Sequence, residues 1–234
     1  MQSEGYTIGT PLVSFKTVLV RFFIALIFSI ALGYFEASVV VYLREIFYPD
    51  GFRFPLQLFT IDPLFKRLCF TEIGREAASI ILIVTAAWLF GNNRRQKLAY
   101  FLIIFSVWDI FYYVWLKVLL DWPATIVDWD ILFLIPMTWA SPVLAPVLCS
   151  IMMFLFAIVI LYRDYTGKSF NTSYLDVSGY FISGLIIIVS FCIPGPHIAK
   201  DDYSRFFYWP LFGSGLFISI GTFTRCLFTK STKP

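Results

Sequence analysis

Long apolar runs recur along the chain, and short polar or charged segments separate them. A helix of about 20 apolar residues matches a hydrocarbon core about 30 Å thick. Because only helices and closed barrels satisfy their backbone hydrogen bonds in lipid, the pattern predicts an all-α, polytopic integral membrane helical bundle forming one domain. The six expected transmembrane spans are about Phe15 to Leu43, Thr71 to Phe90, Lys97 to Leu120, Ile131 to Tyr162, Tyr174 to Ile193 and Phe206 to Phe228.

Two spans have strong stop signals. Gly91, Asn92 and Asn93 follow the second span, and Gly and Asn readily adopt the left-handed conformation at a helix end. The segment 194–196, which reads Pro-Gly-Pro, follows the fifth. Proline and glycine together interrupt regular structure, so both spans are predicted to end at these points.

The fourth apolar run is too long for a simple crossing and is broken by proline. Pro136, Pro142 and Pro146 each remove a backbone donor in its first half. We therefore expect a short helix or re-entrant piece at about 131–139, followed by a true span at about 142–161. Irregular backbone survives at membrane depth only where protein or a wet cavity covers it, so this segment is a candidate wall of a site.

The short loops predict an orientation. Residues 92–97 hold two arginines and a lysine, whereas residues 121–130 hold three aspartates and no basic residue. The positive-inside rule places the first loop in the cytoplasm and the second outside. With six spans both termini are then cytoplasmic, in a membrane that we expect to be the bacterial inner membrane. The hydrophobic loop 44–70 is then external and is expected to lie along the outer membrane face or against a partner.

Composition supports this class and excludes others. Hydrophobic residues make up 59% of the chain and charged residues 14%, against about 45–50% and about 25% in soluble domains. A net charge of +3 is ordinary for a membrane protein, and no nucleic-acid partner is predicted. The single histidine argues against a bis-histidine haem or a histidine-rich copper site, and the four cysteines form no C-x-x-C pair, so neither a cofactor nor a metal is predicted.

Charged and polar residues inside the spans are the best indication of a site. Asp109 lies at the centre of the third span, with Tyr113 and Lys117 at i+4 and i+8 on one helix face. Glu36 and Glu76 lie in the first and second spans, toward their predicted outer ends. A carboxylate at membrane depth costs several kcal/mol, so these residues predict ion pairing, protonation or a hydrated outward-facing pocket that binds a ligand or relays protons.

Other roles remain open for the same residues. Glu72, Arg75 and Glu76 lie near the predicted start of a helix, where capping or solvation explains acidic residues. Lys117 can extend its long side chain to the interface. Asp109 is too short to do so, but a structural hydrogen bond or ion pair to another span would also account for it.

The predicted outer loops hold three weaker candidates. Asp121 and Asp128 flank tryptophans, and with Asp130 they offer carboxylates to a hard cation, although the spacing lacks a calcium-loop pattern. Anchoring of the aromatic residues beside solvated acids is the alternative. His197 is positioned to respond to external pH, or to be simply solvated.

No enzyme motif is present: the sequence lacks G-x-S-x-G, H-E-x-x-H and a phosphate-binding glycine loop. Three hypotheses follow. The first is a small integral membrane subunit of a larger membrane protein complex, with other membrane subunits and the lipid bilayer as partners. The second is a proton- or cation-linked transporter or channel for a small polar solute. The third is an enzyme acting on a lipid or quinone at the outer leaflet.

Overall fold

A computed structural model describes residues 15–57, 63–168, 170 and 172–228. The described residues contain six helices long and apolar enough to cross a membrane, which indicates an integral membrane protein. The helices are α1 (Phe15–Phe47), α2 (Pro63–Phe90), α3 (Arg94–Leu120), α4 (Leu144–Tyr165), α5 (Tyr174–Cys192) and α6 (Trp209–Phe228).

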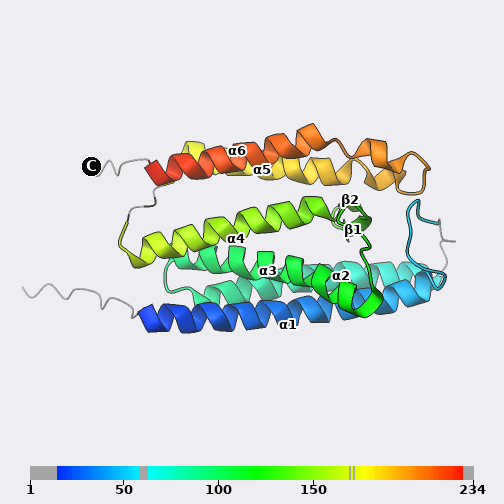
Figure 1. Ribbon diagram of the computed structural model, residues 1–234, viewed down its shortest axis with the longest axis horizontal. Helices are drawn as coiled ribbons and strands as arrows, with labels where there is room; N and C mark the ends of the chain where they lie inside the picture. The colour runs from blue at the N-terminus through cyan, green and yellow to red at the C-terminus, as the bar shows by residue number, and fades with distance from the viewer. Residues whose placement is uncertain (1–14, 58–62, 169, 171, 229–234) are drawn as a thin grey trace, which may run out of the picture.

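The helices form two packed groups (Figure 1). Helix α3 is central in the first group and contacts α1, α2 and α4, while α5 and α6 pack chiefly on each other. Gly33 permits the close approach of α1 to α3, because a Cβ at this position would lie 3.0 Å from the Trp108 carbonyl oxygen. The all-α helical bundle predicted from the apolar runs is therefore confirmed.

Local signals fix several helix ends. Helix α2 ends at Phe90, directly before Gly91, as predicted. The Asn93 side chain then accepts a hydrogen bond from the backbone N–H of Gln96 and caps α3. Asp121 ends α3 in the left-handed conformation, with φ at 52°. Ser173 and Asp176 form a reciprocal capping box at the start of α5.

The fourth apolar run contains the main departure from the predicted helices. The expectation of a short helix at residues 131–139 is wrong, because strands β1 (Trp129–Phe133) and β2 (Trp139–Pro142) form an antiparallel hairpin there. Proline cannot donate a helical hydrogen bond, and Pro136 lies between two short runs that suit strands better than helix turns. Pro146 lies in the first turn of α4, where its missing donor is harmless.

Both ends of the loop predicted at 44–70 are helical. Helix α1 extends to Phe47, and α2 begins at Pro63 rather than at about Thr71, which leaves residues 48–57 as the described part of the connection. Residues 58–62 of the predicted loop lie outside the described residues. Proline is favoured in the first turn of a helix, which explains the early start of α2.

One end of the molecule gathers the β-hairpin and several other non-helical segments (Figure 1). It holds the β-hairpin, residues 48–57 and the short 3-10 helices Gly195–His197 and Tyr203–Phe206, and we call it the hairpin end. Leu56 donates its backbone N–H to the Ile198 carbonyl at 2.8 Å, which ties two of these segments together. Helix α1 begins and α6 ends at the opposite end.

Candidate functional site

A cavity of about 790 Å³ lies at the hairpin end. Side chains from α1, α2, α3 and α4 line it together with the β-hairpin and part of the segment 48–57. Its walls are mainly apolar and aromatic, and five carboxylates and two guanidiniums interrupt them. These charged residues are Glu36, Glu72, Glu76, Asp109, Asp130, Arg44 and Arg75.

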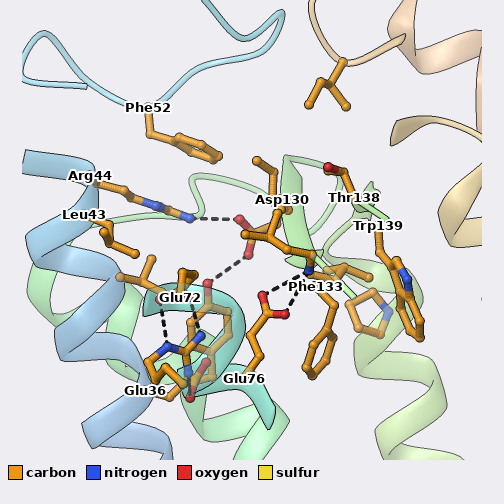
Figure 2. Close-up of a pocket in the computed structure, with 18 of the residues that line it drawn as sticks. Glu36, Leu43, Arg44, Phe52, Glu72, Glu76, Asp130, Phe133, Thr138 and Trp139 are labelled. Atoms are coloured by element: carbon orange, nitrogen blue, oxygen red, sulfur yellow. Dashed lines mark hydrogen bonds and ion pairs between the residues drawn. The ribbon is translucent and has the colours of Figure 1, made fainter. Parts of the chain in front are cut away.

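Arg75 joins two carboxylates from different helices (Figure 2). Its guanidinium contacts Glu36 of α1 and forms a two-pronged ion pair with Glu72, with Nε 2.9 Å from Oε2. Ser79, one turn further along α2, donates its hydroxyl to Glu36 at 3.2 Å. The forked guanidinium suits this arrangement, since it can bind two carboxylates at once.

Arg44 and Asp130 form a second buried ion pair. The Arg44 Nη2 to Asp130 Oδ1 distance is 3.0 Å, and the Tyr112 hydroxyl donates to the other carboxylate oxygen at 3.2 Å. The rings of Phe52 and Trp122 lie 4.0 and 3.8 Å from the guanidinium carbon. Burial raises the pKa of the Asp130 carboxyl, and the Arg44 charge and the Tyr112 hydrogen bond oppose that rise.

The side chain of Glu76 binds the backbone of the hairpin (Figure 2). Both carboxylate oxygens of Glu76 lie 3.0 Å from the backbone nitrogen of Leu134, in the turn after β1. The side chain is buried, and no ion pair joins it to a basic residue in the described part of the chain. Glu76 therefore supplies an acceptor that the turn needs while keeping an uncompensated carboxyl group in the cavity.

Asp109 has a similar environment deeper in the bundle. Its carboxylate accepts a 2.7 Å hydrogen bond from Ser150 of α4, which is a neutral partner. Among the residues that the structure describes, no lysine, arginine or histidine forms an ion pair with it. A carboxyl group in such surroundings is stable either as the protonated acid or beside a cation that comes from outside the chain.

The structure brings four of the predicted candidates into one cavity: Asp109, Glu36, Glu76 and Tyr113 all line it. Lys117 does not line it. Its ammonium lies 2.7 Å from the exposed carboxylate of Asp121, and both side chains are largely in contact with solvent. This pair holds the pKa of Asp121 below its usual range.

The remaining weak candidates also lie outside the cavity lining. Asp128 accepts hydrogen bonds from the Ala124 and Thr125 backbone and from the Thr125 hydroxyl, and thereby closes the turn before β1. His197 stacks on Phe206 with ring centroids 3.7 Å apart. Within the described chain, neither residue forms a hydrogen bond or an ion pair with the charged groups of the cavity.

Neither Arg44 nor Arg75 was among the site residues predicted from the sequence. With α2 expected to start near Thr71, Arg75 belongs to the first turn, where capping or interfacial solvation explains it. Because α2 begins at Pro63, Arg75 instead lies well inside the helix and needs a buried partner. The i,i+3 spacing of Glu72 and Arg75 was a usable signal, whereas the pairing of Arg44 with Asp130 joins residues far apart in sequence and had none.

Within the described residues no group of three or more histidine, cysteine, aspartate or glutamate side chains is arranged to hold a metal ion. Comparison with protein-family models, curated proteins and solved structures finds no match to this chain. The class rests on the fold and the cavity: the described residues form a bundle of six helices long and apolar enough to cross a membrane, with a charged cavity at one end.

Proposed function

We propose that this chain is an integral membrane protein that transports a small polar solute, with movement of a proton or small cation linked to it through the cavity. The observation that carries the proposal is that Asp109 and Glu76 have only neutral hydrogen-bond partners among the described residues. Intramembrane acids in a cavity commonly serve as ion or proton sites.

The charges of the cavity support this proposal over a purely structural role. The two arginines are already engaged by Glu36, Glu72 and Asp130. A structural network would be expected to compensate its remaining acids, because an unpaired buried charge costs several kcal/mol. A site that takes up a proton or cation needs the opposite: carboxyl groups that gain a positive partner during the functional cycle.

The proposed placement in the membrane follows the loop charges. We propose that the six helices insert in the bacterial inner membrane, with both termini cytoplasmic and the hairpin end outside. To test this orientation, single cysteines are introduced in a variant lacking the four native ones. A cysteine at Ala124 should react with an impermeant maleimide added to intact cells, and one at Asn93 should react only after lysis. The reverse pattern would invert the topology.

Proton movement can be measured without knowing the solute. Purified protein is reconstituted into liposomes that contain the pH-sensitive dye pyranine, and a potassium gradient with valinomycin drives protons inward. We expect faster internal acidification than in empty liposomes and a rate near that of empty liposomes for Asp109→Asn. Sodium or potassium gradients with the corresponding indicator dyes extend the test to small cations.

Asp121→Asn is the matched control, since it makes the same chemical change on an exposed residue outside the cavity. It should retain the wild-type rate. If Asp109→Asn liposomes move protons as fast as wild-type liposomes do, the transport proposal, which places the proton path at Asp109, is wrong.

The complex-subunit hypothesis remains a second proposal, favoured by the packing of α5 and α6. These helices pack chiefly on each other and expose large apolar side chains, such as Phe181 and Phe217, that lipid or another chain must cover. Native mass spectrometry after mild extraction tests it: partner chains should raise the mass well above 27.0 kDa. A mass of the lone chain with bound lipid would contradict it.

A further inference from the structure

The size of the cavity points to an occupant larger than an inorganic ion. Its volume of about 790 Å³ falls within the range of about 300–1,000 Å³ that is typical of pockets for drug-sized ligands. Aromatic side chains form much of its wall, including Phe105, Trp108, Phe133 and Trp139. Such walls bind an apolar body, and they add attraction for a cation placed over a ring face.

The charge distribution of the lining favours an occupant with a positive charge. Carboxylates outnumber guanidiniums in the lining, and both guanidiniums already have carboxylate partners. Asp109 and Glu76 retain acceptor capacity that their neutral partners do not use, since an ionised carboxylate offers about four lone-pair sites. A protonated amine supplies both the positive charge and the donors that these two groups lack.

Unpartnered donors in the cavity lining give a second, independent indication. Arg44 has a side chain only 8% exposed, and its Nη1 has no hydrogen-bond partner among the described residues. Trp108, which is 4% exposed, likewise has an indole N–H without a partner in that part of the chain. Buried donors of this kind are rare, and an oxygen acceptor on a bound molecule would satisfy them.

We propose that the cavity binds an amphipathic organic amine that also carries an oxygen acceptor. Asp109 and Glu76 receive the ammonium group, the free donors of Arg44 and Trp108 face the oxygen, and the aromatic wall holds the apolar body. This inference rests on the proposed transport function and names the class of its solute.

Radiolabelled propranolol is a suitable probe, because it combines a naphthyl body, ether and hydroxyl oxygens and a secondary amine that is protonated at neutral pH. Binding is measured to the full-length protein in phosphatidylcholine nanodiscs, with empty nanodiscs as the background. Three competitors separate the contributions of the positive charge, the apolar body and the oxygen atoms to binding. They are N-acetylpropranolol, which is neutral, 1-amino-2-propanol, which lacks the apolar body, and the propranolol analogue with methylene groups in place of the ether oxygen and the carbinol.

We expect saturable binding of propranolol, with each competitor at least about tenfold weaker, a ratio that corresponds to 1.4 kcal/mol. In Asp109→Asn the preference for propranolol over its neutral acetyl derivative should fall about tenfold. In Trp108→Phe the preference over the oxygen-free analogue should fall instead, because a smaller aromatic face remains for the apolar body while the indole N–H is lost. Asp121→Asn should bind as the wild type does, which also verifies folding and reconstitution.

Equal binding of propranolol and N-acetylpropranolol would overturn the amine assignment, and so would an unchanged preference in Asp109→Asn. Absence of saturable binding would overturn it as well. These results are separable from a failure of the transport proposal. Proton flux that depends on Asp109 without amine binding removes only the inference, whereas amine binding together with proton flux that Asp109→Asn leaves unchanged keeps the binding site and removes the transport proposal.

Discussion

The guanidinium of Arg75 on α2 contacts the carboxylate of Glu36 on α1, although both helices pack mainly against α3 rather than against each other. Glu72 holds the same guanidinium from within α2. The ion pair therefore fixes the relative position of two helices that both line the cavity, and it does so where little direct helix contact is available.

Replacing Arg75 with leucine should strongly destabilise the protein. The change leaves Glu36 and Glu72 buried without a positive partner, and breaking a buried pair from one side costs about 3–5 kcal/mol. The free energy of unfolding is measured by titrating the protein from dodecylmaltoside into sodium dodecyl sulfate. Adding Glu36→Gln to Arg75→Leu should recover part of the loss. Arg94→Leu, at an exposed position, should change stability by less than about 0.5 kcal/mol, and an equal loss there would refute the explanation.

Glu76 should be required as an acceptor more than as a charge for folding. Glu76→Gln keeps an oxygen for the Leu134 N–H, whereas Glu76→Ala leaves that donor without its partner, at a cost of about 1–3 kcal/mol. In the same unfolding titration the Glu76→Gln variant should therefore be clearly more stable than the Glu76→Ala variant. Equal stability of the two variants would show that the hairpin does not depend on this bond.

Arg44 should not be replaceable by lysine. Lysine keeps the charge opposite Asp130 but loses the flat group that lies over the rings of Phe52 and Trp122, and such cation–π contact contributes about 0.5–2 kcal/mol. We expect Arg44→Lys to lower the free energy of unfolding by about that amount. Trp122→Phe, which retains an aromatic face, should lower the free energy of unfolding by less than Trp122→Ala does. A fully stable Arg44→Lys would mean that charge alone holds this contact.

The apolar pattern was sufficient to predict the six helices because burial in lipid imposes a length and composition on each span. It also identified Glu36 and Asp109 as unusual, since no local feature explains these acids at depth. Glu76 was a candidate too, but its place near the predicted start of a helix left capping or solvation as an alternative. The pattern failed at residues 129–142, where the run is apolar enough for a helix. Pro136 marks an interruption of the run, but the hairpin itself is formed by pairing of Trp129–Phe133 with Trp139–Pro142, and such pairing is not a local property.

The partners of the acids could not be predicted for the same reason. Lys117 shares a predicted face of α3 with Asp109, and both pairing and extension to the interface were open for it. Its long side chain reaches Asp121 at the exposed end of that helix. Periodicity places residues on a helix face, but the helix that covers this face is determined by packing across the whole bundle. Ser150 of α4, and not Lys117, is therefore the group that contacts Asp109.

Asp128 should give the turn before β1 a stability that depends on pH. Burial raises the pKa of its carboxyl, but hydrogen bonds from the Thr125 side chain and backbone and from the Ala124 backbone outweigh this effect, so the folded pKa is lower than usual. The pKa of an aspartate in an unfolded chain is about 3.9. The stabilisation is therefore fully present above that pH and is lost as the pH falls through the folded pKa.

Asp128→Asn removes this titration and accordingly serves as the reference. The melting temperature of both proteins is measured in dodecylmaltoside between pH 3 and pH 7. The wild type should be the more stable protein at pH 7, and its advantage should shrink below about pH 4, where the carboxyl begins to be protonated. A difference that stays constant over this range would show that the hydrogen bonds of Asp128 do not favour its charged form, because only a preference for the carboxylate makes the stabilisation depend on pH.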